Sequence, residues 1–131
     1  EFFAEQNQKT VIIHIEGMEG IRAFDEIVEV AGIDVIFIGP YDLSQSLGLP
    51  GQVSDPKVLA AIEKLTAKCR EKGKYVGIFA DTPEAAKRYK DLGVKYIAYS
   101  VDVGIFAEAC RELTKKLGIG CPGLLNISKE S

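Results

Sequence analysis

The sequence of 131 residues predicts an α/β fold built on a parallel sheet. Two observations lead to this prediction. Short runs of β-branched and aromatic residues alternate with longer segments in which apolar residues recur at helical spacing. Proline and glycine residues fall at the borders between these segments, where helices begin and end. Because strands that are joined by helices pair in parallel through right-handed crossovers, we expect strand and helix to alternate four times.

Four apolar runs are predicted to be strands. The first, residues 11–15, reads Val-Ile-Ile-His-Ile, and the second, residues 35–38, reads Val-Ile-Phe-Ile. Two more runs follow at residues 75–79 and 96–99. Because the apolar residues in these runs are continuous rather than alternating, we expect the strands to be buried on both faces.

A helix is predicted after each strand. The residues expected to share a helical face are Ile21, Phe24, Ile27, Val28 and Ala31 in the first helix, Val58, Ile62, Leu65 and Cys69 in the second, Ala85, Ala86, Tyr89 and Leu92 in the third, and Phe106, Cys110, Leu113 and Leu117 in the fourth. Asp55 and Thr82 each precede a proline, as capping residues do before the first helical position. Glycines at 32, 73, 93 and 118 lie where these helices should end. Both cysteines on these faces are expected to be buried thiols.

Four strand–helix units are compatible with two architectures. One is a small, open, doubly wound sheet, and the other is half of a (β/α)8 TIM barrel, whose full length is about 250 residues. The length of the chain favours the open sheet, because a half barrel exposes two strand edges. Residues 1–8 look like the end of a truncated helix, which favours the half barrel. Residues 1–131 are expected to form a single domain, which is a partial one if the half barrel is correct, with residues 119–131 as a tail.

Composition argues against several functional classes. Apolar residues make up 47% of the chain and charged residues 27%, as in an ordinary folded domain. The formal net charge of −3 provides no basic surface for nucleic acid, and no apolar run approaches the roughly 20 residues that span a membrane. The three cysteines do not suggest a disulfide framework, and no signal-peptide pattern opens the chain, so we expect a cytoplasmic protein.

Two acidic residues lie where a ligand site is expected. Ligands of parallel α/β folds bind at the carboxyl ends of the strands. Glu16 directly follows the first predicted strand, and Asp42 lies in the loop that Gly39 and Pro40 open after the second. If these strands are neighbours about 4.8 Å apart, the two carboxylates repel unless a cation lies between them or one is protonated. Such a pair suits a hard divalent ion such as Mg²⁺ or Mn²⁺. Alternatively, Glu16 is an acid at a helix N-terminus and Asp42 caps a short helical turn.

Two further residues are candidates for the same site. His14, the single histidine, is expected to point to the same side as Glu16, two residues later. It is either a packing residue or a hydrogen-bond donor to a substrate carboxylate. Phe79, at the end of the third strand, is either a core residue or a pocket wall. Asp81 is interpreted as part of a turn with Thr82.

Several segments resemble the HpcH/HpaI aldolase family, the metal-dependent class II pyruvate aldolases. They are Ile-His-Ile-Glu at residues 13–16, Gly-Ile-Asp-Val-Ile-Phe-Ile-Gly-Pro-Tyr-Asp-Leu-Ser at 32–44 and Leu-Gly at 47–48. The resemblance continues through residues 73–79, 86–89 and 101–102, and ends at about residue 117. It covers only the second half of that family's TIM barrel, strands five to eight. We therefore expect about four βα units of such a barrel.

The resemblance implies an activity and a set of ligands. Family members cleave a 4-hydroxy-2-oxo acid to pyruvate, or a related 2-oxo acid, and an aldehyde. The residues that match the metal ligands are Glu16 and Asp42, and the ion expected is Mg²⁺ or Mn²⁺, with Co²⁺ also compatible. The residues implied to bind the substrate are His14, Gly39, Pro40, Tyr41 and Phe79. His14 stands where relatives often have Gln, and Tyr41 where a small residue is common.

The resemblance also marks what the chain lacks. The family's catalytic Arg and its His acid/base lie on earlier strands, so no catalytic residue is assigned within residues 1–131. Two rival interpretations follow: a catalytically silent half barrel that binds metal or oxo acid, and an independent flavodoxin-like binding domain. Relatives assemble as oligomers through an exchanged C-terminal helix, so we expect a homo-oligomer in which residues 104–117 pack on another subunit.

Overall fold

A computed structural model describes residues 9–119, and strand and helix alternate through them as the sequence predicts. The strands are β1 (Ile12–Ile15), β2 (Val35–Ile38), β3 (Tyr75–Ala80) and β4 (Tyr96–Tyr99). They pair in parallel in the order β1-β2-β3-β4. A doubly wound sheet of the flavodoxin type needs a point at which the strand order reverses. The sequential order has none among the described strands and matches successive strands of a TIM barrel. The predicted truncated helix at 1–8 lies outside the described residues.

The helices differ from the prediction mainly in the first half of the chain. The segment predicted as one helix after β1 forms two short ones, α2 (Met18–Arg22) and α3 (Phe24–Ile27), which meet at Ala23. The loop after β2 contains a helix, α4 (Pro40–Ser46), whose N-cap is Gly39. Asp42 is therefore not an N-cap as one interpretation held, because the helix already begins two residues before it.

The two proline-containing helix starts are confirmed. The side chain of Asp55 accepts a hydrogen bond from the Lys57 backbone N–H at 2.8 Å, and α5 (Pro56–Glu71) follows. Thr82 accepts from the Ala85 backbone N–H at 3.1 Å at the start of α6 (Pro83–Asp91). Each contact satisfies one of the N–H groups that a helix leaves without an internal partner.

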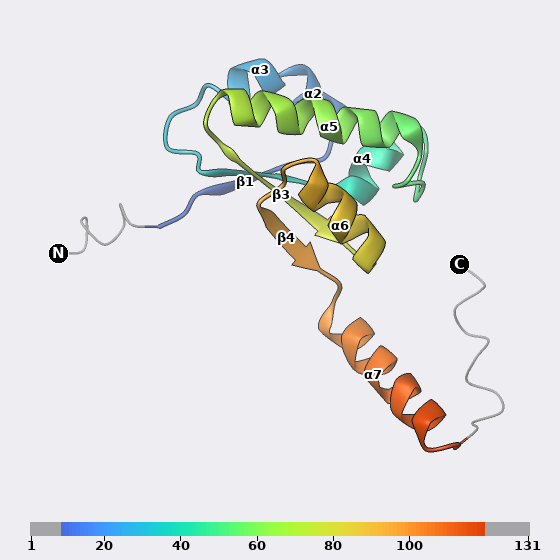
Figure 1. Ribbon diagram of the computed structural model, residues 1–131. Helices are drawn as coiled ribbons and strands as arrows, with labels where there is room; N and C mark the ends of the chain where they lie inside the picture. The colour runs from blue at the N-terminus through green and yellow to red at the C-terminus, as the bar shows by residue number, and fades with distance from the viewer. Residues whose placement is uncertain (1–8, 120–131) are drawn as a thin grey trace. The chain divides into compact units, whose positions relative to one another are not determined.

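The core lies between the sheet and one layer of helices. In Figure 1, α2, α3 and α5 lie on one side of the strands. The fully buried members of this core include Phe24 on α3, Leu43 on α4 and Val58, Ile62 and Cys69 on α5. The sheet contributes alternate residues to it: Ile15, Ile36, Ile38, Val76, Ile78 and Ala80. Buried apolar surface is the main stabilising contribution in a domain of this kind.

The other face of the sheet is open, which corrects the expectation that the strands are buried on both faces. Side chains alternate across a strand, so Ile12, Phe37, Tyr75 and Tyr96 project from the face opposite the core. Ile12, Tyr75 and Tyr96 are 46%, 60% and 47% exposed. The sequence pattern was misleading because a barrel strand is apolar on both faces, one toward the helices and one toward the barrel interior.

An in-register row of side chains crosses this open face. His14, Phe37, Gly77 and Tyr96 are successive pairing partners across β1 to β4. The rings of His14 and Phe37 meet edge to face with centroids 5.1 Å apart, and those of Phe37 and Tyr96 are 5.9 Å apart. A Cβ on Gly77 would approach the Phe37 ring to 2.6 Å, so only glycine leaves room for the aromatic rings on either side.

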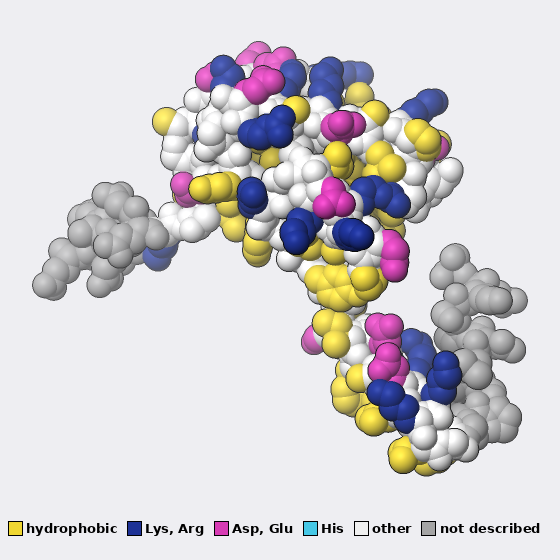
Figure 2. All heavy atoms as spheres, viewed as in Figure 1, with side chains coloured by type: hydrophobic (Ala, Val, Ile, Leu, Met, Phe, Trp, Pro, Cys, Tyr) yellow, Lys and Arg dark blue, Asp and Glu magenta, His cyan; other side chains and the backbone are white. Residues whose placement is uncertain are grey.

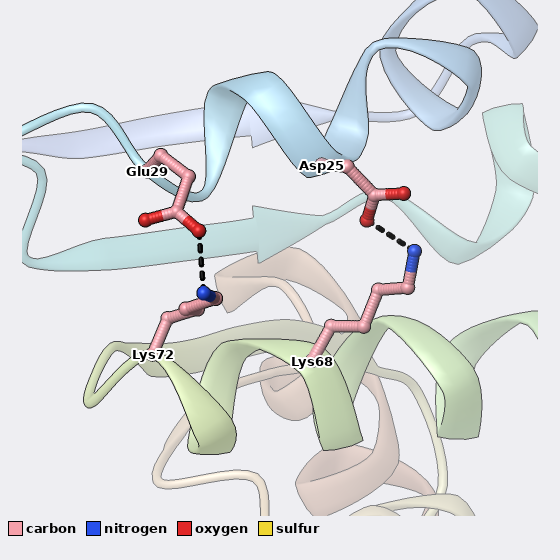
Figure 3. A network of polar contacts seen from close by, with 4 residues as sticks. All are labelled: Asp25, Glu29, Lys68 and Lys72. Atoms are coloured by element: carbon pink, nitrogen blue, oxygen red, sulfur yellow. Dashed lines mark hydrogen bonds and ion pairs between the residues drawn. The ribbon is translucent and has the colours of Figure 1, made fainter.

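Charged side chains cover the outside of the helix layer. Figure 2 shows Lys and Arg side chains interspersed with Asp and Glu over the face in view. Two ion pairs join α3 and the turn after it to the C-terminal end of α5 and its C-cap residue: Lys68 with Asp25, and Lys72 with Glu29 at 2.5 Å (Figure 3). Lys68 holds the pKa of the Asp25 carboxyl below its ordinary value by donating a hydrogen bond to it. Exposed pairs of this kind contribute little to stability and are weakened by salt.

The last described helix, α7 (Asp102–Lys116), belongs to a separate compact unit that begins at Ser100. None of its residues is buried. Cys110 is therefore exposed, which contradicts its predicted burial, whereas Cys69 is fully buried as expected. Burial raises the pKa of the Cys69 thiol to about 11. Among the described helices, none is both long and apolar enough to cross a membrane.

Candidate functional site

The pairing of β1 with β2 brings the segments of both predicted metal ligands to one edge of the sheet. Ile15 pairs with Ile38, and the Gly39 backbone N–H donates to the Ile15 carbonyl at 3.2 Å. Glu16 follows β1 at the level where Gly39 follows β2. Asp42 lies in the first turn of α4, which starts immediately after Gly39. The neighbour relation on which the paired-carboxylate prediction depended is thus present.

His14 and Glu16 interact directly at this edge. The His14 Nε2 atom lies 3.2 Å from Oε2 of Glu16, and the two side chains are 51% and 44% exposed. The same imidazole packs edge to face on Phe37. The ring of His14 therefore packs within the row on the open face, and its Nε2 atom faces Glu16.

Gly39 leaves the space in which these two side chains meet. A Cβ on this residue would lie 2.8 Å from Oε2 of Glu16, 2.8 Å from Nε2 of His14 and 3.1 Å from the Glu16 Cβ. The backbone of Gly39, with φ of −85°, is open to any residue type. The close approach of the two side chains, rather than backbone conformation, is what requires glycine here.

Two serines of α4 hold the helix against the strand ends. Ser46 Oγ donates to the Glu16 carbonyl at 3.1 Å, which ties the C-terminal end of α4 to the residue after β1. The fully buried Ser44 donates to the Tyr41 carbonyl at 2.6 Å and accepts from the Gly51 N–H at 3.1 Å. These contacts fix the loop that carries Asp42. Sequence reasoning did not assign the serines, although Ser44 stands in the run that carries the family resemblance.

Tyr41 and Asp81 form a contact between the loops that follow β2 and β3. The Tyr41 hydroxyl donates a hydrogen bond to Oδ2 of Asp81. This bond is the main cause that raises the pKa of Tyr41 to about 12. The Tyr41 ring also lies beside Phe79, with centroids 6.3 Å apart. Asp81 was interpreted as part of a local turn, but its side chain has a partner 40 residues earlier in the sequence.

The side chains of Glu16 and Asp42 are of a chemical type that suits a divalent ion. The two acids supply carboxylate oxygens, which hard cations prefer, and the space beside Gly39 accommodates the Glu16 carboxylate. Within residues 9–119 no three or more His, Cys, Asp or Glu side chains form a metal-binding group. If Glu16 and Asp42 hold an ion, its remaining ligands would come from water or from a bound molecule.

A hollow of about 470 Å³ lies at the other end of the open face. Residues near the strand starts line it: Thr10, Ile12, Val35, Tyr75, Lys95 and Tyr96. Its walls are mostly apolar and carry no carboxylate. Because ligands of parallel α/β folds bind at the carboxyl ends of the strands, we place the candidate site at Glu16 and Asp42 instead.

Comparisons with known proteins agree on one family. The family model described as HpcH/HpaI aldolase/citrate lyase matches residues 2–109. A 4-hydroxy-2-oxo-heptane-1,7-dioate aldolase of Escherichia coli is 38% identical over 112 residues, which cover 86% of this chain and 43% of the relative. A hydroxypyruvate/pyruvate aldolase of Pseudomonas aeruginosa is 36% identical over 115 residues, which cover 88% of this chain and 43% of that enzyme.

The fold of the chain is also similar to that of a solved member of this family. An HpcH/HpaI aldolase/citrate lyase family protein from Burkholderia cenocepacia matches with a TM-score of 0.80 and 33% identity. The match covers 85% of this chain and 43% of that one. The chain thus spans less than half the length of the curated relatives it matches. The predicted fold class, about four βα units of a TIM-barrel family, is confirmed.

Proposed function

The chain belongs to the HpcH/HpaI aldolase/citrate lyase family, and from this premise we propose that it carries the metal-binding half of an aldolase-type carbon–carbon lyase. The reaction is the cleavage of a 4-hydroxy-2-oxo acid to pyruvate, or a related 2-oxo acid, and an aldehyde. The two relatives described above, which are 38% and 36% identical to this chain, are named aldolases. The observation that carries the proposal is the adjacency of β1 and β2, which brings Glu16 and Asp42 to one edge of the sheet.

In this proposal the two carboxylates hold Mg²⁺ or Mn²⁺. When bound, the ion acts as a Lewis acid that stabilises the negative charge developing on the oxo acid as the carbon–carbon bond breaks. Glu16 is oriented by its contact with His14 and by the space beside Gly39. Asp42 is oriented by α4, which Ser46 ties to the Glu16 backbone.

The other predicted site residues bind the oxo acid. The Tyr41 and Asp42 backbone N–H groups hold its carboxylate, and the His14 imidazole, whose Nε2 atom faces Glu16, lines the site on the side of β1. Pro40 fixes the first turn of α4 from which the Tyr41 and Asp42 amides project. Phe79 forms an apolar wall at the end of β3. Proton transfer to or from the aldehyde oxygen requires groups beyond those assigned in residues 1–131.

Binding and turnover are tested separately. We expect Mn²⁺ to bind the chain in a calorimetric titration, and pyruvate to bind more tightly when Mn²⁺ is present. Glu16→Gln and Asp42→Asn keep the size of each side chain and remove its charge, so each should weaken Mn²⁺ binding by at least tenfold. Glu19→Gln, a change of an exposed acid on α2, is the matched control and should bind as the unmodified chain does.

The outcomes separate the competing interpretations. Cleavage of 4-hydroxy-2-oxo acids by the chain supports a complete catalytic centre. Binding of Mn²⁺ and pyruvate without cleavage supports a half barrel that is silent by itself. If Glu16→Gln and Asp42→Asn bind Mn²⁺ as tightly as Glu19→Gln does, the two acids do not share an ion and the proposal is wrong.

We also propose that the protein is a cytoplasmic homo-oligomer that uses α7. Exposed apolar residues of this helix and its C-cap recur at alternating spacings of three and four, as in helices that pack on a partner: Val103, Phe106, Cys110, Leu113 and Leu117. Phe106→Asp should lower the mass found by sedimentation equilibrium. Lys115 lies on the opposite side of the helix from Phe106 by helical spacing, so Lys115→Ala should leave the mass unchanged. An unchanged mass for both variants would contradict this role of α7.

A further inference from the structure

The contact between Tyr41 and Asp81 lies at the end of the sheet that carries the proposed metal ligands. Tyr41 is the second residue of α4 and immediately precedes Asp42. Asp81 directly follows β3. Because β2 and β3 pair in parallel, the loops that follow them are neighbours. The hydrogen bond from the Tyr41 hydroxyl to the Asp81 carboxylate therefore spans two strand ends within one rim.

This bond fixes the position of an aromatic ring. Tyr41 is 42% exposed, and a side chain so open to water has little packing to hold it in one rotamer. The hydrogen bond holds the ring tilted by 56° against Phe79. Phe79 projects from the open face of β3. It follows Gly77, the β3 member of the row that contains His14, by two residues. The two rings thus form an aromatic wall at the rim, on the β3 side of the helix start that carries Asp42.

We propose that Asp81 is a positioning residue that holds Tyr41 against Phe79, so that this wall selects 2-oxo acids with little bulk on carbon 3. The inference rests on the proposed function, because it assumes that the oxo acid binds beside Asp42. The wall excludes 2-oxo acids with branched side chains only if its two rings keep their positions. A Tyr41 ring released from Asp81 turns into solvent and leaves room for them.

The experiment measures binding of two ligands to the full chain in the presence of Mn²⁺. The ligands are pyruvate and 3-methyl-2-oxobutanoate, which carries two more methyl groups on carbon 3. One methylene of misfit in an apolar pocket changes affinity by about tenfold or more. We therefore expect the unmodified chain to prefer pyruvate by at least about tenfold.

Three variants isolate the hydrogen bond. Tyr41→Phe keeps the ring and removes the donor, Asp81→Ala removes the acceptor, and Asp81→Asn keeps an acceptor oxygen without the charge. We expect the preference for pyruvate to fall below about threefold in the first two variants and to be retained in Asp81→Asn. Asp91→Ala is the control, because it removes an exposed acid at the other end of α6, the helix that follows Asp81. This variant should retain the preference for pyruvate.

The results distinguish this inference from the proposed function. Absence of Mn²⁺-dependent pyruvate binding in the unmodified chain overturns both. Binding with the same preference in all variants overturns the role of Asp81 and leaves the proposed function intact. Loss of preference in Asp81→Asn as well as in Asp81→Ala also overturns it, because the charge rather than the held ring would then be responsible.

Discussion

Replacement of Gly39 by alanine tests whether the space beside this residue organises the site. The added Cβ would lie 2.8 Å from both Oε2 of Glu16 and Nε2 of His14. Ordinary van der Waals contact begins at 3.4 Å, so each atom must retreat by about 0.6 Å. Binding groups must be held within about 0.5 Å of their working positions. Glu16 cannot simply rotate its carboxylate away, because its own Cβ is also only 3.1 Å from the new methyl group.

The expected result is a loss of metal affinity without a loss of fold. We expect Gly39→Ala to weaken Mn²⁺ binding by about tenfold, which corresponds to about 1.4 kcal/mol. The free energy of unfolding should change by less than about 1 kcal/mol, because two effects oppose each other. Strained side-chain rotamers cost about 0.5–1.5 kcal/mol, whereas a Gly→Ala change at a compatible φ stabilises by about 0.4–1 kcal/mol through the unfolded state.

Gly17 provides a matched control in the same region. It directly follows Glu16, its φ is −109°, and a Cβ there would meet nothing within 4 Å. Gly17→Ala should therefore bind Mn²⁺ as the unmodified chain does, in calorimetry and in electron paramagnetic resonance of the bound ion. The reasoning is refuted if Gly39→Ala is folded by circular dichroism and binds Mn²⁺ as tightly as Gly17→Ala.

Three further predictions concern the sheet, a helix start and the rim. Gly77→Ala places a methyl group 2.6 Å from the Phe37 ring. It should lower the free energy of unfolding, measured by urea titration, by about 1–3 kcal/mol. An unchanged urea midpoint would contradict the close packing of Phe37 and Tyr96 around this glycine. Thr82→Ala removes the cap of α6 and should cost about 0.5–2 kcal/mol by the same measurement. The pKa of Tyr41 is raised above its unfolded value of 10.0 to about 12; its contribution to stability is therefore complete below pH 10 and disappears as the pH rises through 12. Asp81→Ala should move this titration toward 10 in ultraviolet difference spectra, and a titration that stays near 12 would exclude the bond as the cause.

The strands and most helix boundaries follow from local signals in the sequence. Val35 to Ile38 is a strand because β-branched and aromatic residues suit a pleated surface, and α5 and α6 begin where a capping residue precedes a proline. Burial could not be predicted in the same way. Ile12 and Ile13 are both apolar, yet only Ile13 faces the core, because the helices cover one side of the sheet alone.

The candidate site was predictable to the extent that it lies within continuous motifs. Glu16 and Asp42 were identified from their positions after two strands, and the pairing of those strands agrees. The bond between Tyr41 and Asp81 was not identified, because no local pattern relates two residues 40 positions apart. The exposure of Cys110 was missed for a related reason: an amphipathic helix indicates that one of its faces needs a partner, but not where that partner is.

The sequential strand order has a consequence for how the chain acquires its structure during synthesis. Ile12 pairs with Val35, Val35 with Tyr75 and Gly77 with Tyr96, so each new strand joins the one made just before it. Contacts that are close along the chain form quickly, because little chain entropy is lost in closing them. A nascent polypeptide can therefore extend this sheet one strand at a time as it leaves the ribosome, with no earlier pairing to undo.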